Sequence, residues 1–139
     1  MLVDTSVVVA CYVPESISDR TQRILSDADV RPTICSLTEV EFHSAISRLV
    51  RMKALSADSG RRITEQFRTH IQQGVYGFCP MTQAAYELAR DWLGSFRTSL
   101  RTLDALHLAV ARTGELTFVT ADKPLARAGR KLGVAVRSV

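Results

Sequence analysis

Three aspartates stand beside apolar segments that are typical of a protein core. Asp104 lies within "LRTLDALHLAVAR", a pattern that predicts a buried helix over residues 103–112. Asp4 directly follows the apolar run "MLV", and Asp122 comes three positions after "TFV". A carboxylate among apolar side chains is costly unless a cation or hydrogen-bond donors meet it. Each of these aspartates therefore needs a partner.

Helix capping is the simplest explanation for each aspartate taken alone. If Thr102 is an N-cap, Asp104 falls in the first helical turn, where free N–H groups and the helix dipole favour a negative charge. Asp4 begins "DTS" and Asp122 precedes "KPLARAGRKLG", so both are also suitable helix caps. Capping explains each aspartate singly, but it would not explain several acids brought together at one place in the fold.

The pattern of the whole chain predicts elements that bring these acids together. Short apolar, β-branched runs predict strands buried on both faces at 1–3, 33–35, 117–119 and 134–136, with a weaker fifth at 75–79. Helical periodicity predicts helices at 17–28, 38–53, 57–73, 82–96, 103–112 and 123–132, with Ser56 and Thr82 as N-caps. Strands that alternate with helices indicate an α/β protein of three layers, α/β/α, around a mostly parallel sheet of four to five strands.

The carboxyl edge of that sheet is where the acids should meet. Parallel sheets of this kind bind ligands beyond the carboxyl ends of their strands, and Asp4 and Asp122 each follow a predicted strand. Asp104 at a helix start and one glutamate of "TEVEFHSAISR", either Glu39 or Glu41, could complete a cluster. Clustered carboxylates repel one another unless a cation neutralises them, and their hard oxygens favour Mg²⁺ or Mn²⁺. Such ions activate water and stabilise leaving oxygens in phosphate chemistry.

Composition narrows the remaining classes of protein. The chain has 139 residues and 46% hydrophobic content, which is enough for one domain over 1–139 with its own core. Its N-terminus has no basic stretch before the apolar run, so we expect no signal peptide and no membrane span. The three separated cysteines favour a reducing, cytoplasmic setting. A net charge of +4 favours polyanionic partners weakly.

Four motifs together resemble the PIN-domain ribonucleases, in particular bacterial toxins of the VapC type. They are "LVDTSVVVACYVPE", "SLTEVEFHSAISRLVR", "LRTLDALHLAVA" and "FVTADKPLARAGRKLGV", and they cover essentially the whole chain in the family's order. The resemblance places the family's acids on Asp4, Asp104, Asp122 and, of the two glutamates, Glu41. Helical periodicity does not choose Glu41 over Glu39. The family's supporting polar positions fall on Ser6 and Thr120.

The resemblance implies a Mg²⁺- or Mn²⁺-dependent endoribonuclease that cleaves RNA with metal-activated water and leaves a 5′-phosphate. It also implies a homodimer inhibited by a VapB-type antitoxin. Two other functions stay open: a Mg²⁺-dependent phosphohydrolase that forms an aspartyl-phosphate on Asp4, and a non-catalytic RNA-binding module. Ser6 disfavours the phosphohydrolase, because such enzymes of the haloacid dehalogenase type usually carry a second aspartate at that position.

The other chemically capable side chains give weaker signals. His43, His70 and His107 are too scattered for a metal motif, and His107 is better explained by core packing or a local hydrogen bond. His43 and His70 are expected at the surface. Basic residues lie near the acids in the sequence, at Arg97, Arg101, Arg112 and within 123–131. They could meet a phosphate backbone or form a solvated helix face.

Overall fold

One parallel sheet forms the centre of the molecule. The computed structural model describes residues 1–13, 21, 23 and 31–139, and the predicted helix at 17–28 lies almost wholly outside them. Within the described residues, the sheet consists of β1 (Leu2–Val3), β2 (Thr33–Ile34), β3 (Gly77–Phe78), β4 (Phe118–Thr120) and β5 (Val136–Ser138). All neighbouring strands pair in parallel, in the order β3-β2-β1-β4-β5. The predicted α/β class is confirmed, and the weaker fifth strand is present as β3.

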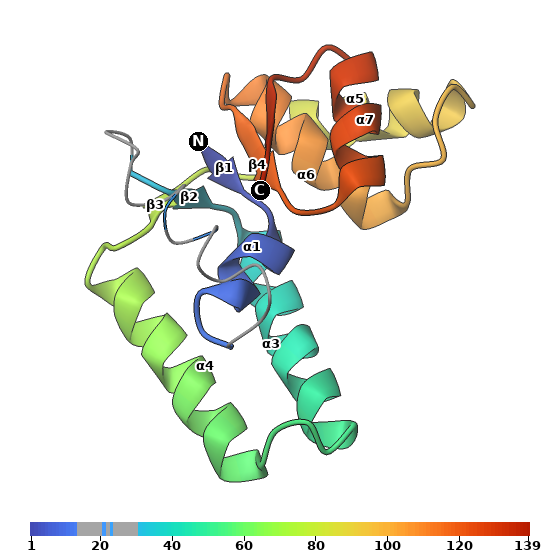
Figure 1. Ribbon diagram of the computed structural model, residues 1–139. Helices are drawn as coiled ribbons and strands as arrows, with labels where there is room; N and C mark the ends of the chain where they lie inside the picture. Colours follow the sequence, from blue (N-terminus) through green and yellow to red (C-terminus); the bar gives the residue numbers. More distant parts are fainter. Residues whose placement is uncertain (14–20, 22, 24–30) are drawn as a thin grey trace.

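Helices cover both faces of this sheet (Figure 1). The described helices are α1 (Thr5–Ala10), α3 (Ser36–Arg51), α4 (Ala57–Gln72), α5 (Gln83–Gly94), α6 (Thr102–Thr113) and α7 (Lys123–Lys131). In Figure 1, α3 and α4 extend together away from the sheet, whereas α5, α6 and α7 gather on the opposite side. None of the described helices is both long and apolar enough to cross a lipid bilayer.

The central strands β1 and β4 contribute side chains to two separate hydrophobic cores. Successive side chains of a strand point to opposite faces. Leu2 and Phe118 accordingly pack with α5, α6 and α7, whereas Val3 and Val119 pack with α1, α3 and α4. Because both faces of β1 and β4 are buried, these strands are apolar without alternation, as the sequence predicts. The edge strands β3 and β5 are partly exposed, and there the prediction of two buried faces is wrong.

Helix boundaries follow the capping residues in most places. Ser56 and Thr82 cap α4 and α5 as predicted, through bonds from the N–H groups of Ser59 and Ala85. Thr102 is not the N-cap of α6; Arg101 occupies that position, and the helix begins one residue earlier than expected. Helix α3 begins two residues earlier than expected, and β5 begins two residues later. The short helix α1 was not anticipated.

The order of the strands places two acids at a topological switch point. The chain proceeds from β1 to β2 and β3 in one direction and then returns to place β4 and β5 on the other side of β1. In open parallel sheets, ligands bind beyond the carboxyl ends of the strands where this reversal occurs. Asp4 follows β1 and Asp122 follows β4, so they flank the reversal.

Close packing at Gly129 brings α7 against its neighbours. A Cβ atom at Gly129 would lie 2.9 Å from Cδ2 of Leu108 on α6 and 2.8 Å from Cγ2 of Val136 on β5. A side chain at this position would therefore force the side chains of Leu108 and Val136 to shift. The approach matters because α6 and α7 carry Asp104 and Asp122 at their N-terminal ends.

Candidate functional site

Asp4 is held at the end of β1 by backbone and side-chain bonds. Its N–H donates to the carbonyl of Val119 at 2.9 Å, which continues the pairing of β1 with β4. Its Oδ2 accepts hydrogen bonds from Ser6 Oγ at 2.6 Å and from Thr120 Oγ1 at 2.7 Å. The residue is only 8% exposed, so two hydroxyl donors replace much of the water that its charge loses. The two predicted supporting residues thus both contact Asp4.

Thr120 also joins Asp4 to Asp122. The Thr120 hydroxyl oxygen accepts a hydrogen bond from the N–H of Asp122 at 3.0 Å while its proton goes to Asp4. Asp122 in turn caps α7, since its Oδ1 accepts from the N–H of Leu125 at 2.8 Å. The capping interpretation is therefore correct for Asp122, and it coexists with a position beside Asp4 at the sheet edge.

Asp104 lies in the first turn of α6, where the sequence placed it. Burial raises the pKa of its carboxyl group, and the negative charges of Asp4 and Asp122 raise it further. The backbone N–H of Arg101 and the nearby His107 act in the opposite direction without cancelling the rise. The charges of Asp4 and Asp122 therefore disfavour the ionised form of Asp104.

Glu41 on α3 faces the same region but has its own partners. Its Oε2 accepts hydrogen bonds from Thr5 Oγ1 at 2.6 Å and from His107 Nε2 at 2.5 Å. Burial alone would raise the pKa of Glu41, but these two bonds and the charge of His107 lower it below its usual value. Glu41 is therefore an ionised carboxylate whose Oε2 already has two donors.

His107 is buried on α6 and is turned toward α3. Burial would lower its pKa, yet its contacts with Cys35 and Glu41 prevail and raise the pKa to about 10. Its Nδ1 lies 4.0 Å from the sulfur of Cys35. The prediction of core packing is confirmed, but the hydrogen bond crosses to another helix and does not involve Asp104.

A single pocket of about 620 Å³ collects the four acids, and we call it the acid pocket. Arginine side chains from two elements line it beside the carboxylates: Arg48 and Arg51 from α3, and Arg101 at the start of α6. Its lining residues are Asp4, Thr5, Ser6, Val9, Glu41, Ser44, Ala45, Arg48, Arg51, Arg101, Leu103, Asp104, His107, Asp122 and Leu125. Carboxylates and arginines that line the same pocket suit a phosphate group bound through a cation.

The donors of the acid pocket suit a hard divalent cation in type. Asp4, Asp104 and Asp122 offer carboxylate oxygens, and a bound cation would relieve the repulsion that the charges of Asp4 and Asp122 exert on Asp104. In the part of the chain that the structure describes, however, no three such side chains already stand in an arrangement that would hold an ion. The carboxylates thus match the ion chemically but are not closed into a finished coordination shell.

Several residues of the acid pocket were not predicted from the sequence. Thr5, Arg48 and Arg51 were not singled out, although Arg48 and Arg51 follow Glu41 at roughly helical spacing. Glu39, unlike Glu41, does not line the pocket. Of the basic residues noted in the sequence, Arg101 lines it, whereas Arg112 lines a separate hollow.

The other two histidines lie outside the acid pocket. His43 is exposed, as predicted. His70 is partly exposed, and its Nδ1 lies 2.7 Å from the hydroxyl oxygen of Tyr12.

The sheet topology and the acid pocket define an α/β protein with an acidic pocket at the topological switch point of its sheet. The sequence matches the family model of the PIN domain over residues 1–131, and the chain belongs to that family. The resemblance inferred from the four motifs is thereby confirmed. A comparison with curated protein sequences finds no match.

Solved structures of similar fold come from several bacteria, and they include a toxin and a toxin–antitoxin complex. FitAcB from Neisseria gonorrhoeae is 19% identical with a TM-score of 0.75, and the match covers 97% of this chain and 94% of that one. VapC20 from Mycobacterium tuberculosis, a toxin that cleaves the sarcin-ricin loop, is 18% identical with a TM-score of 0.70 and coverages of 92% and 94%. A toxin–antitoxin complex from Klebsiella pneumoniae is 18% identical with a TM-score of 0.65 and coverages of 90% and 89%.

Proposed function

We propose that this protein is a Mg²⁺- or Mn²⁺-dependent endoribonuclease and the toxin of a toxin–antitoxin pair. The observation that carries the proposal is the acid pocket: four carboxylates from β1, α3, α6 and α7 around one hollow, with arginines beside them, in a PIN-domain chain. RNA supplies a phosphate for the arginines and a scissile bond for the acids. The whole chain, residues 1–139, acts as one domain.

Asp4, Asp104 and Asp122 hold the metal in this proposal, and Glu41 completes the acidic surroundings. When bound, a divalent ion lowers the pKa of water and stabilises the leaving oxygen of a phosphodiester. Ser6 and Thr120 orient the Asp4 carboxylate through its Oδ2 and leave Oδ1 for the ligand. His107 and Thr5 fix Glu41 through Oε2 and leave Oε1 to orient water. Arg48, Arg51 and Arg101 attract and position the RNA backbone.

An antitoxin of the VapB type is the proposed partner. Solved structures of similar fold include a toxin–antitoxin complex, which supports a partner of this kind. We also propose that the protein is a homodimer that acts on RNA in the cytoplasm. Light scattering of the purified protein, alone and with the product of an adjacent gene, tests both assembly proposals.

The nuclease proposal is tested by incubating purified protein with total cellular RNA in Mg²⁺, in Mn²⁺ and in EDTA. Asp4→Asn is the matched control, because it keeps the size and hydrogen-bonding capacity of the side chain but removes its charge. We expect cleavage with either metal, none in EDTA, and a loss of at least about 100-fold in rate for Asp4→Asn. Cleavage that persists in EDTA or in the variant would overturn the proposal.

Binding of RNA without cleavage would favour the hypothesis of a non-catalytic RNA-binding module. If the folded protein retains RNA in EDTA and cleaves nothing with any divalent ion, it is an RNA-binding module. Mass spectrometry of the purified sample checks beforehand that no antitoxin remains bound.

A further inference from the structure

The positive charge of the chain is concentrated after Asp122. Residues 123–139 carry five of the 18 basic residues and none of the 14 acidic ones. The rest of the chain is left with 13 basic residues against 14 acids, so it has no positive net charge of its own. Four of the five basic residues lie on α7, and the fifth, Arg137, lies on the neighbouring strand β5. This part of the surface should therefore attract polyanions.

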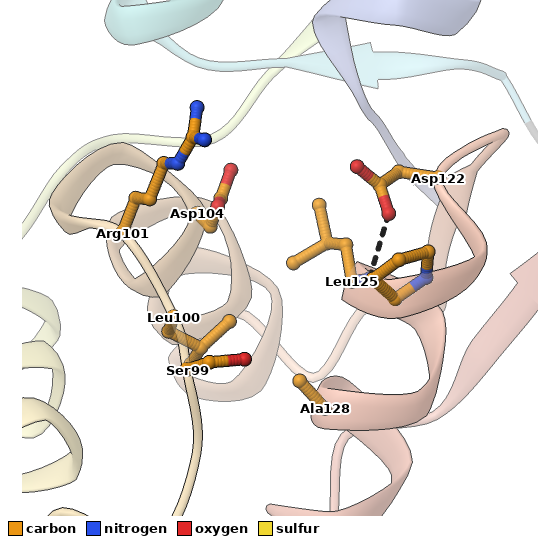
Figure 2. Close-up of a pocket in the computed structure, with 8 residues that line it drawn as sticks. Ser99, Leu100, Arg101, Asp104, Asp122, Leu125 and Ala128 are labelled. Atoms are coloured by element: carbon orange, nitrogen blue, oxygen red, sulfur yellow. Dashed lines mark hydrogen bonds between the residues drawn. The ribbon is translucent and has the colours of Figure 1, made fainter.

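Helix α7 carries its basic side chains on the solvent side. The buried residues of α7 are uncharged, and its exposed basic residues are Lys123, Arg127, Arg130 and Lys131. Because Lys123, Arg127 and Arg130 recur at intervals of four and three residues, they form one row along the helix. The row begins next to Asp122, which lines the acid pocket. Figure 2 shows Asp122 at the start of α7, across a hollow from Asp104 and Arg101. The row therefore leads away from the acid pocket along α7.

Structural roles account for the two basic residues at the end of α7. Arg130 and Lys131 lie in the last turn, where the helix dipole favours a positive charge. Arg130 Nη2 donates hydrogen bonds to the carbonyl of Val136 at 3.3 Å and to the hydroxyl oxygen of Ser138 at 3.0 Å. Lys131 Nζ donates to the backbone carbonyl of Arg97 at 3.0 Å. Both side chains thus help to fasten α7 to its neighbours.

No such role accounts for Lys123 and Arg127. Lys123 is the first residue of α7, where the helix dipole opposes a positive charge, and Arg127 lies in the middle of the helix, where the dipole has little effect. Among the residues that the structure describes, neither side chain forms an ion pair or a hydrogen bond with another residue. Two exposed cations beside the acid pocket are therefore available to a ligand.

We propose that Lys123 and Arg127 bind backbone phosphates of the RNA outside the acid pocket, so that the strand leaves the pocket along α7. The proposal rests on the proposed nuclease function, because a scissile phosphate at the carboxylates brings nearby phosphates of the same strand to the start of α7. Residues at i and i+4 of a helix are neighbours on its surface, so two long cationic side chains there can bind two phosphates of one strand. Contacts with phosphates position RNA without reading its sequence. They should therefore strengthen the binding of long RNA, whatever its sequence.

The experiment measures the affinity of protein variants for two lengths of labelled single-stranded RNA by fluorescence anisotropy. The tetranucleotide has phosphates enough for the arginines of the acid pocket alone, and it is also the probe for the salt dependence of that pocket. The second probe has about twelve nucleotides and can extend along α7. Every protein carries Asp4→Asn, so that Mg²⁺ can be present without cleavage.

The test variant combines Lys123→Gln with Arg127→Gln. The matched control combines Arg62→Gln with Arg68→Gln, which removes two exposed cations from α4, on the other side of the sheet (Figure 1). A third variant, Lys123→Arg with Arg127→Lys, keeps both charges. Arg127→Gln alone serves if the double variant does not fold.

Loss of the two phosphate contacts should weaken the binding of the longer RNA by about 25-fold at about 0.1 M salt, and loss of one by about fivefold. The same substitutions should weaken the binding of the tetranucleotide by less than about twofold, because that probe does not extend along α7. The α4 variant and the charge-conserving variant should bind both probes like the parent protein. If the α4 variant loses as much affinity as the α7 variant, or if both probes lose equally, the proposal is wrong.

A cleavage assay of the protein with Asp4 intact separates this proposal from the nuclease proposal. If that protein cleaves no RNA but the longer probe is bound through Lys123 and Arg127, the nuclease proposal fails and the contacts along α7 stand. If it cleaves RNA and the α7 variant binds the longer probe as the parent does, only the contacts along α7 fail. If the α7 variant weakens the binding of a protein partner and not of RNA, the exposed face of α7 binds that partner and the proposal is overturned.

Discussion

Glu41 and His107 illustrate how one buried contact fixes a carboxylate. His107 is 2% exposed, and its imidazole gives Glu41 a second donor beside Thr5. Its pKa of about 10 lies above the ordinary value of 6.5, so protonated His107 is favoured in the folded protein. The stabilisation of the folded protein by protonated His107 is complete below about pH 6.5 and is lost as the pH rises through about 10. Glu41, with its lowered pKa, contributes above its ordinary value of 4.5 and loses this contribution in acid.

Replacing His107 by leucine should therefore destabilise the protein in a pH-dependent way. We expect the free energy of unfolding at pH 6 to fall by about 2 kcal/mol, because Glu41 loses a donor to its charge. The difference from the wild type should shrink toward pH 10. Urea unfolding in EDTA across this range measures it. His43→Leu, on the exposed face of α3, is the control and should change little. If the variant's loss of unfolding free energy stays constant from pH 6 to 10, protonated His107 does not stabilise Glu41.

The sequence predicts the acids of the site better than the residues that support them. Asp4 and Asp122 can be found because each follows an apolar strand, and parallel strands end at a common edge. The bond of His107 to Glu41 could not be predicted, since it depends on how α6 and α3 face each other across 66 positions of sequence. The arginines of α3 were missed for the same reason: their spacing on a helix does not reveal what lies opposite.

At the scale of elements, the start of α7 combines a structural and a chemical role in one side chain. Asp122 caps the helix with Oδ1 and also borders the acid pocket. Asparagine caps a helix as well as aspartate does, whereas alanine does not. The two roles can therefore be separated by two substitutions at one position.

Asp122→Asn should keep the stability of the wild type within about 0.5 kcal/mol, and Asp122→Ala should lose about 1 kcal/mol. Both should lose metal-dependent cleavage, because both lack the charge. Thermal unfolding and the RNA assay measure the two effects. Ser56→Ala removes the comparable cap of α4, outside the acid pocket, and should lower stability while leaving cleavage intact. Equal stability of the two Asp122 variants would refute the capping role.

Element boundaries could be predicted where capping and periodicity agree, as for α4 and α5. Helix α1 was missed because "TSVVVA" is rich in β-branched valine, which favours strands in isolation. In the structure, β1 ends at Val3, and the valines of α1 are buried against α3 and β4. Packing therefore overrides local preference here. Edge strands were misjudged because sequence alone does not say which strand lies outermost.

At the scale of the whole molecule, the net charge of +4 matters less than where the cations lie. Arg48, Arg51 and Arg101 line the acid pocket, so RNA binding should involve about three phosphate contacts. For single strands, each contact contributes roughly −0.7 to the slope of log K against log salt concentration. The expected slope for the Asp4→Asn protein is therefore about −2.

Arg48→Ala should reduce the magnitude of that slope by about 0.7. Arg112→Ala, at the far end of α6 beside a different hollow, should leave it unchanged. Fluorescence anisotropy of a labelled oligonucleotide at several salt concentrations measures both variants. Equal slopes for Arg48→Ala and Arg112→Ala would show that the pocket arginines do not contact the backbone.

The central position of β1 in the sheet also determines when the acid pocket can form during synthesis of the chain. Strand β1 is synthesised well before its partner β4, so the N–H groups of Leu2 and Asp4 can bond to the carbonyls of Thr117 and Val119 only once β4 has been made. Asp122 follows later still. The four acids cannot meet until Asp122 has emerged. For the proposed nuclease, this order of assembly would keep each nascent copy inactive until the residues of the site are all present.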